Sequence, residues 1–151
     1  MPIEKLVHIL LVEDNKMDIV LTLDAFREAH LSNEIHVVHN GEEALQYLFG
    51  ENKFADRKTY PLPNLILLDL KMPGIDGFEV LKRVKNTREI KRIPIIILTS
   101  SKEEGDLTMG YDLGANSYLV KPVSFEGFLD VVRKVTDYWI TLNIEPPVSC
   151  R

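Results

Sequence analysis

The sequence predicts an α/β fold in which five parallel strands form a doubly wound sheet with helices on both faces. Short apolar runs alternate with segments of helical periodicity, which is the pattern of a parallel sheet. Several runs are apolar at every position, as expected for strands that are buried on both faces. With 151 residues, the chain has the size of one domain with a substantial core.

Each expected element has its own signal, beginning with an apolar strand over residues 7–12. The helix after it carries apolar residues at helical spacing and extends to about residue 30. A short strand over 35–39 and a helix over 41–49 form the second pair. The link over 50–63 is longer than the usual two to six residues, and packing and a subunit contact are both open as its role.

The second half of the chain continues the alternation. Residues 65–68 and 95–98 are uniformly apolar and are expected near the centre of the sheet, with a helix over 77–86 between them. The fourth helix is expected to begin near Ser101, because Ser101 and Glu104 have the spacing of a capping box.

The last pair is a strand over 117–120 and a helix over 124–142. An apolar stripe predicts that this helix packs on the sheet: Phe125, Phe128, Val132, Val135 and Trp139. The fourth helix contains Gly105 and Gly110, each of which costs about 1 kcal/mol relative to alanine. One hypothesis is that this helix is marginal and shifts during signalling; the alternative is that one glycine permits close packing.

Composition and charge narrow the classes of function. A net charge of −5 argues against nonspecific nucleic-acid binding. No apolar run approaches the roughly 20 residues that cross a bilayer, and the amino terminus lacks the core of a secretory signal. The single cysteine, Cys150, rules out an internal disulfide and fits the cytosol. We therefore expect a cytoplasmic protein that binds neither nucleic acid nor membrane.

Acidic residues follow two of the apolar strands. Glu13 and Asp14 come directly after the first strand, and Asp69 follows the third. The carboxyl ends of parallel strands open into one crevice, so the three carboxylates should meet there. Two unit charges about 4 Å apart repel by roughly 4 kcal/mol at an effective dielectric near 20, so a cation such as Mg²⁺ is expected. The alternative is that Glu13 and Asp14 only stabilise the start of the following helix.

A hydroxyl and an amine end the fourth and fifth strands, at Thr99 and Lys121. A carboxylate such as Asp69 can form an aspartyl phosphate, and a metal with Lys121 would offset the charge of the transferring group. Thr99 could donate a hydrogen bond to a phosphoryl oxygen. Taken singly, Thr99 could be a hydroxyl satisfied by backbone and Lys121 a surface amine. At successive strand ends they point together to a phosphoryl site.

These residues resemble the receiver domain of two-component response regulators. The matching segments are Glu13-Asp14, Leu68-Asp69-Leu70-Lys71-Met72-Pro73-Gly74, Thr99-Ser100-Ser101 and Lys121-Pro122. The resemblance covers about residues 6–143 and leaves 144–151 as a short tail without an output domain. It implies the three-layer, flavodoxin-like (βα)5 fold with strand order 2-1-3-4-5.

The resemblance also implies the chemistry. Asp69 would accept a phosphoryl group from the phosphohistidine of a sensor histidine kinase, while Thr99 and Lys121 hold that group. Magnesium would be the cofactor, and its implied ligands are Glu13, Asp14, Asp69 and the backbone carbonyl of Lys71. Such a protein is not an enzyme in the ordinary sense, because its chemistry is limited to its own phosphotransfer and dephosphorylation.

Signalling would depend on a switch made by Thr99 and Tyr118, which lies three residues before Lys121. In this family, phosphorylation changes the surface formed by the fourth helix, the fifth strand and the fifth helix, and with it the affinity for a downstream protein. Lys71 and Ser101 occupy the positions that tune the lifetime of the phosphoryl group.

In its long link and short tail, the chain resembles single-domain regulators that work with phytochrome-type kinases, such as cyanobacterial phytochrome response regulators. This similarity implies a phytochrome-type kinase as the partner. Some members of that group dimerise, which leaves a homodimer open. The sequence does not identify the downstream protein.

Three other interpretations compete with a regulator. A magnesium-dependent phosphatase of the haloacid dehalogenase type normally has a second aspartate where this chain has Lys71. A flavodoxin-like flavin binder would need a phosphate loop rich in Ser, Thr and Gly, whereas the loop at Glu13 and Asp14 is acidic. A scaffold that acts without phosphorylation stays open.

The spacing of the histidines in the sequence does not indicate a shared metal site. His36 and His39 would face opposite sides of a regular strand, and neither His8 nor His30 has a partner close in sequence.

Overall fold

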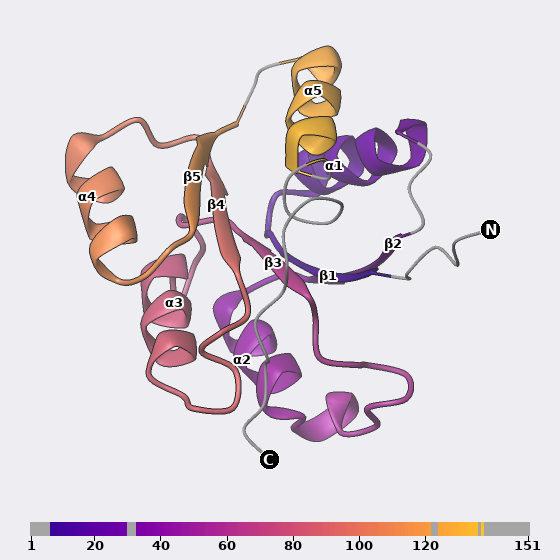
Figure 1. Ribbon diagram of the computed structural model, residues 1–151, viewed down its shortest axis with the longest axis vertical. Coiled ribbons are helices and arrows are strands. Elements are labelled where there is room, and N and C mark those ends of the chain that lie inside the picture. The colour runs from indigo at the N-terminus through magenta and orange to yellow at the C-terminus, as the bar shows by residue number, and fades with distance from the viewer. Residues whose placement is uncertain (1–6, 30–32, 122–123, 136, 138–151) are drawn as a thin grey trace.

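The computed structural model, which describes residues 7–29, 33–121, 124–135 and 137, contains a five-stranded parallel sheet with helices on both faces (Figure 1). The strands are β1 (Val7–Val12), β2 (Asn33–Val38), β3 (Leu65–Leu68), β4 (Ile95–Thr99) and β5 (Ser117–Val120). The helices are α1 (Lys16–Glu28), α2 (Gly41–Phe49), α3 (Gly77–Lys85), α4 (Glu104–Asp112) and α5 (Phe125–Val135), with a 3-10 turn η1 (Asn52–Phe54). The strand order β2-β1-β3-β4-β5 confirms the predicted fold class.

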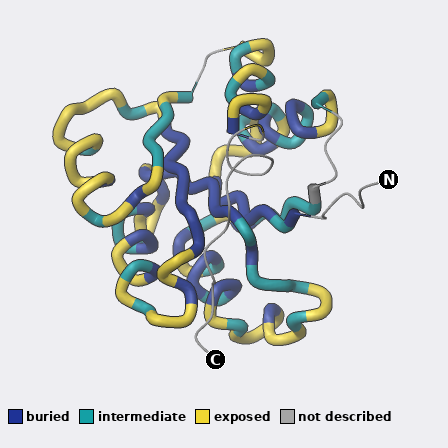
Figure 2. Tube along the Cα trace, in the orientation of Figure 1, coloured by how far each residue is buried: buried dark blue, intermediate teal, exposed yellow. Residues whose placement is uncertain are grey.

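The sheet is buried between two apolar layers because successive side chains of a strand point to opposite faces. In β1, Ile9 and Leu11 pack with Phe26 of α1 and Phe128 of α5. Leu10 of the same strand faces the other layer, which contains residues from α2 and α3. Figure 2 shows that the central strands are buried along their length, whereas α4 is mostly exposed.

Most predicted boundaries agree with the structure to within two residues, but the expected start of the fourth helix is wrong. α4 begins at Glu104, its N-cap residue is Glu103, and no side chain caps it. The Ser101 hydroxyl instead donates to the Asp106 carboxylate at 2.5 Å. Ser101 therefore contacts the first turn of α4 through a side chain rather than through the backbone N–H groups of a capping box.

The apolar stripe of the last helix is confirmed for Phe128, Val132 and Val135, which are all buried. Phe125, in the first turn, is 37% exposed and therefore contributes less to the stripe than predicted. His30, Trp139 and the tail over 144–151 lie outside the described residues.

The long link over 50–63 packs against α2. Phe54 and Tyr60 of the link contact Tyr47 of α2, with ring centroids between 5.1 and 5.9 Å apart. The guanidinium of Arg57 donates to the carbonyls of Tyr47 at 2.7 Å and Leu48 at 2.9 Å. These carbonyls lie in the last turn of α2, where the usual donors of the following turn are missing. The N–H of Gly50 donates to the Tyr47 carbonyl at 3.2 Å, and Arg57 of the link adds a donor to both carbonyls.

Candidate functional site

The carboxyl ends of β1 and β3 position two of the predicted carboxylates. The N–H of Asp69 donates to the carbonyl of Val12, and the N–H of Glu13 donates to that of Val38, both at 3.0 Å. These bonds extend the sheet one residue past the strand ends. At Gly77 an added Cβ would lie 2.3 Å from the carbonyl oxygen of Asp69, so only glycine lets the start of α3 approach this backbone so closely.

The three carboxylates that the sequence placed in one crevice do meet. Glu13, Asp14 and Asp69 each offer an oxygen, and these oxygens all lie within 4.8 Å of one another. Glu13 and Asp69 are buried, whereas Asp14 is exposed at the rim. Such an all-oxygen set, with one side open to solvent, has the donor chemistry that Mg²⁺ prefers.

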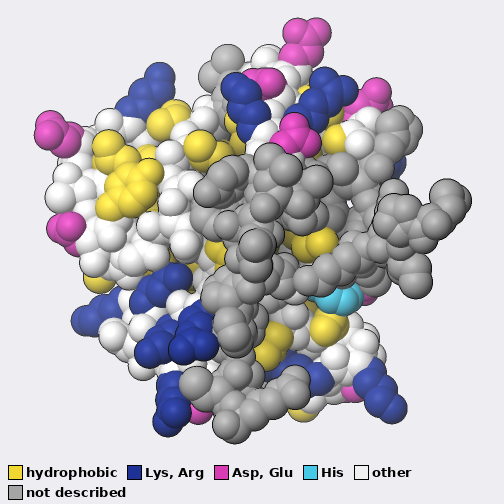
Figure 3. All heavy atoms as spheres, in the orientation of Figure 1, with side chains coloured by type: hydrophobic (Ala, Val, Ile, Leu, Met, Phe, Trp, Pro, Cys, Tyr) yellow, Lys and Arg dark blue, Asp and Glu magenta, His cyan; other side chains and the backbone are white. Residues whose placement is uncertain are grey.

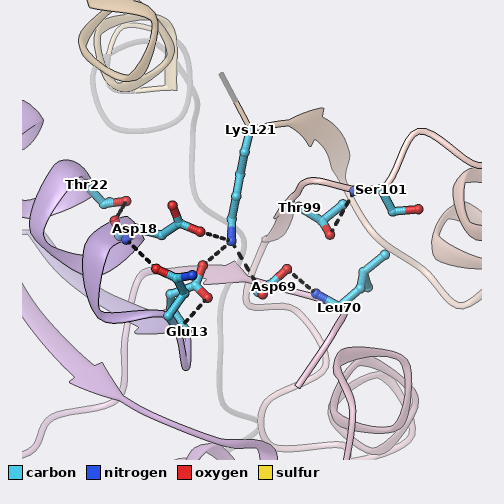
Figure 4. Close-up of polar contacts among 9 residues, drawn as sticks. Glu13, Asp18, Thr22, Asp69, Leu70, Thr99, Ser101 and Lys121 are labelled. Carbon is cyan, nitrogen blue, oxygen red and sulfur yellow. Dashed lines mark hydrogen bonds and ion pairs between the residues drawn. The ribbon is translucent and has the colours of Figure 1, made fainter. Parts of the chain in front are cut away.

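Lys121 enters this cluster from the end of β5 (Figure 4). Its ammonium contacts the carboxylate of Glu13, lies 2.8 Å from Asp18 Oδ2 and lies 3.4 Å from Asp69 Oδ2. Only 7% of its side chain is exposed. One buried cation thus compensates several carboxylates.

Asp18 is a member of the site that the sequence analysis missed. It lies in the first turn of α1, three residues after the N-cap Asn15, whose side chain accepts from the N–H of Asp18 at 3.0 Å. The available signal was its spacing, because a residue four positions after Asp14 at a helix start lies close to the same strand end.

The pKa values of two groups at this site, Glu13 and Lys121, are both raised, but for different reasons. Burial raises the pKa of Glu13 to about 7; the hydrogen bond from Lys121 opposes this shift, and the nearby charge of Asp69 adds to it. Burial alone would lower the pKa of Lys121, but its bonds with Asp18 and Glu13 and the charge of Asp69 raise it overall. The lysine therefore stays cationic throughout the physiological range.

Asp69 and Thr99 are both held by neighbouring backbone. The N–H of Leu70 donates to Asp69 Oδ1 at 2.8 Å, which fixes the carboxylate. Thr99 is fully buried at the end of β4, and its hydroxyl accepts from the N–H of Ser101 at 3.4 Å. The N–H of Lys121 donates to the Thr99 carbonyl at 2.7 Å, so the two strand ends are linked directly.

The predicted switch and lifetime residues form a second group beside the carboxylates. The Lys71 ammonium lies 3.2 Å from Asp106 Oδ2, and the Ser101 hydroxyl donates to the same carboxylate. The Tyr118 hydroxyl donates to the carbonyl of Ser101 at 3.1 Å. Lys71 thus makes an ion pair with Asp106 of α4, a residue that the sequence analysis did not single out.

Within the described part of the chain, no helix is both long enough and apolar enough to cross a membrane.

Comparison with protein families gives one match that covers most of the chain. The model described as the response regulator receiver domain matches residues 9–133. Among curated proteins, the probable methanogenesis regulatory protein FilR2 of Methanothrix harundinacea is 37% identical over 91% of this chain and 86% of its own length. The response regulator Rcp1 of Synechocystis is 35% identical over 87% of this chain and 88% of its own length.

Solved structures agree with this match. The phosphorylated cyanobacterial phytochrome response regulator RcpA has a TM-score of 0.88 and 36% identity, over 94% of this chain and 99% of that one. The Mn²⁺-bound form of Rcp1 has a TM-score of 0.83 and 34% identity, over 93% of this chain and 99% of that one.

Proposed function

This chain belongs to the response regulator receiver domain family, and from this premise we propose that Asp69 accepts a phosphoryl group from a sensor histidine kinase. One observation carries the proposal: Asp69 is a buried carboxylate at a strand end, with the Lys121 ammonium 3.4 Å from its Oδ2 and two further carboxylates beside it. A buried nucleophile beside a fixed cation is suited to phosphoryl transfer.

In the proposed transfer, an oxygen of Asp69 forms a bond to phosphorus while the bond between phosphorus and the kinase imidazole breaks. The imidazole nitrogen keeps the electron pair and takes up a proton. The N–H of Leu70 orients the attacking carboxylate, Lys121 offsets the charge on the phosphoryl oxygens and the Thr99 hydroxyl donates to one of them.

The residues at this site fit a divalent cation. The oxygen donors of Glu13, Asp14 and Asp69 are within 4.8 Å of one another, and we propose that they hold Mg²⁺ together with the backbone carbonyl of Lys71. When bound, Mg²⁺ supplies positive charge that stabilises the transferring phosphoryl group. The Mn²⁺-bound form of the relative Rcp1 supports a metal in this family.

We further propose that phosphorylation is transmitted through Thr99 and Tyr118 to α4. Tyr118 contacts the Ser101 carbonyl, and Ser101 contacts Asp106 in the first turn of α4. Exposed apolar side chains gather over α4 and β5, in the upper left of Figure 3: Leu107, Met109, Tyr111 and Val120. A shift between two conformations of this surface would change its affinity for a downstream protein.

The similarity to Rcp1 and RcpA supports a phytochrome-type kinase as the phosphoryl donor. FilR2, a relative of comparable identity, is a methanogenesis regulatory protein by its name, so the identity of the kinase needs a direct test. We also propose that the protein is cytoplasmic, and a homodimer stays open. Lys71 and Ser101 are the residues that we propose to set the lifetime of the phosphoryl group.

The test is the intact mass of the protein after incubation with acetyl phosphate, with and without Mg²⁺. We expect the wild type to gain one phosphoryl group in a Mg²⁺-dependent manner and Asp69→Asn to gain none. Asp112→Asn, which removes an exposed carboxylate of α4, is the matched control and should behave like the wild type.

Phosphorylated kinases, including phytochrome-type ones, are then incubated with the wild type and the same variants. Rapid transfer from a phytochrome-type kinase would identify the donor. If neither acetyl phosphate nor any kinase phosphorylates the wild type, the proposed function is wrong and a phosphorylation-independent scaffold is favoured.

A further inference from the structure

Two histidines and a glutamate meet on β1 and β2, away from the phosphoacceptor site. Donor atoms of His8, Glu34 and His36 all lie within 4.8 Å of one another. The parallel register pairs His8 with Glu34 and Leu10 with His36, so all three side chains emerge from the same face of the sheet. Glu13 lies five residues after His8, about 16 Å further along at the rise of a strand, so the two clusters are separate.

The two imidazoles present buried nitrogens that lack a hydrogen-bond partner. These atoms are His8 Nδ1 and His36 Nε2. The Glu34 carboxylate lies between them, with Oε2 3.4 Å from the first nitrogen and Oε1 3.2 Å from the second. Each nitrogen is thus within ion-pair distance of a carboxylate oxygen but makes no hydrogen bond to it. Since buried polar atoms are nearly always hydrogen-bonded, this arrangement indicates a missing ligand that the three side chains share.

We propose that His8, Glu34 and His36 bind a divalent transition-metal ion of the zinc class. The observed N···O separations of 3.4 and 3.2 Å match the spacing of adjacent ligands around tetrahedral zinc, which is about 3.4 Å for bonds of about 2.1 Å. Two imidazoles with one carboxylate suit zinc far better than magnesium. This site does not depend on the proposed phosphoryl transfer.

The surroundings hold the ligands in place yet leave the site accessible. The His36 ring packs near Tyr47 and Tyr60, with centroid distances of 5.6 and 6.0 Å. The N–H of His8 donates to the side chain of Asn64 at 2.8 Å, which fixes the backbone of the first ligand. The Glu34 side chain is 45% exposed, so an ion can enter from solvent and keep a water as its fourth ligand.

Calorimetric titration of the full chain with Zn²⁺, in buffer saturated with Mg²⁺ to occupy the acidic pocket, tests the proposal. We expect one zinc per chain. His36→Gln and Glu34→Gln should each reduce the zinc affinity by more than the roughly 10–100-fold that follows loss of a residue that only hydrogen-bonds to a metal ligand. Glu34→Gln changes a half-exposed side chain and keeps its shape, so it tests the site with little risk to folding. His39→Gln, at an exposed histidine outside the cluster, is the matched control and should bind like the wild type.

Titration with Co²⁺ gives an independent readout, because a tetrahedral cobalt site absorbs strongly in the visible range. The wild type, His39→Gln and Asp69→Asn should all develop this absorption, and the two cluster variants should not. Equal zinc affinity in the wild type and both cluster variants would overturn the proposal, as would binding that is lost only in Asp69→Asn. Absence of any zinc binding to the wild type would overturn it as well.

Discussion

Helices α2 and α4 contain nine residues each, but they are fixed to the sheet to very different degrees. In α2, five residues are buried, the Asn40 side chain caps the first turn, and Gly50 ends the helix in a left-handed conformation. In α4, only Gly110 is buried and no side chain caps the start. The core therefore holds α2 firmly, whereas α4 has few buried contacts with the rest of the fold.

This difference indicates where the molecule can change shape at a low cost in free energy. A helix with few buried contacts opens locally at low free energy, whereas a helix in the core opens only with the whole domain. α4 is also the helix whose first turn contacts Ser101 and Lys71, next to the proposed phosphoacceptor. The weakly packed helix thus lies where a signal would have to leave the site.

The largest expected difference between α2 and α4 comes from shortening one leucine in each helix. Leu48 of α2 is 2% exposed and Leu107 of α4 is 39% exposed. We expect Leu48→Ala to lower the free energy of unfolding by about 2–5 kcal/mol, because it leaves a cavity. Leu107→Ala should change it by less than about 0.5 kcal/mol. Urea unfolding measures both, and similar losses would show that α4 is packed as tightly as α2.

The two glycines of α4 give the next largest effect. At Gly110 an added Cβ would lie 2.8 Å from Ile97 Cδ1 and 3.2 Å from Tyr118 Cδ2, whereas at Gly105 it would meet nothing within 4 Å. We expect Gly110→Ala to cost about 1–3 kcal/mol by overpacking. Gly105→Ala should stabilise α4 by about 0.4–1 kcal/mol.

Urea unfolding measures the first glycine variant, and hydrogen exchange of the α4 amides measures the second. These results would separate the two explanations for the glycines, because Gly110 permits close packing while Gly105 only weakens the helix. If exchange is equal in α2 and α4, and unchanged by phosphorylation, the idea that α4 shifts is wrong.

Exchanging the caps is expected to have a smaller effect. Asn40 accepts from the N–H of Glu43 at 2.8 Å, so Asn40→Ala should cost about 1 kcal/mol. Glu103, the uncapped N-cap residue of α4, has extended backbone geometry that suits serine. Glu103→Ser should slow hydrogen exchange in the first turn of α4 by a few-fold without changing α2. An unchanged rate would mean that the missing cap does not limit the stability of α4.

The smallest expected effect is on the dependence of stability on pH. The hydrogen bond from the N–H of His39 lowers the pKa of Glu43 in α2, and the bond from Ser101 and then Lys71 lowers the pKa of Asp106 in α4. A lowered folded-state pKa gives stability that is present at neutral pH and is lost as the pH falls through that pKa. Glu43→Gln should therefore weaken the fold at pH 7, and weaken it less at an acidic pH below 4.5, the ordinary pKa of a glutamate.

Asp106→Asn should change the free energy of unfolding by less than Glu43→Gln does, because α4 has few buried residues to couple it to the unfolding of the whole domain. Urea unfolding of both variants at the two pH values provides the measurement. An equal pH dependence for Glu43→Gln and Asp106→Asn would contradict the difference between the helices.

The sequence was sufficient to predict that the residues at the strand ends lie close together. Asp69, Thr99 and Lys121 each follow an apolar run, and parallel strands bring such positions together whatever the loops do. Their roles in phosphoryl transfer are predictions that the acetyl phosphate experiment tests.

Contacts that depend on side-chain reach or on register could not be predicted in the same way. Ser101 has the spacing of a cap, but its hydroxyl donates to the carboxylate of Asp106, two residues further along than the Glu104 of the expected capping box. The ion pair between Lys121 and Asp18 joins residues more than one hundred positions apart. His8 and Glu34 become neighbours only through the register of β1 and β2, which the separate strands do not reveal.

The contacts of Arg57 have a consequence for how this fold can vary. Its guanidinium contacts the main-chain oxygens of Tyr47, Leu48 and Tyr60 and none of their side chains in these bonds. Main-chain oxygens are present whatever residue occupies a position, so these three bonds do not depend on which side chains stand at the positions of Tyr47, Leu48 and Tyr60. The side chains of Tyr47 and Leu48 are buried, so sequence variation at the end of α2 is limited by packing in the core and not by the bonds from the arginine.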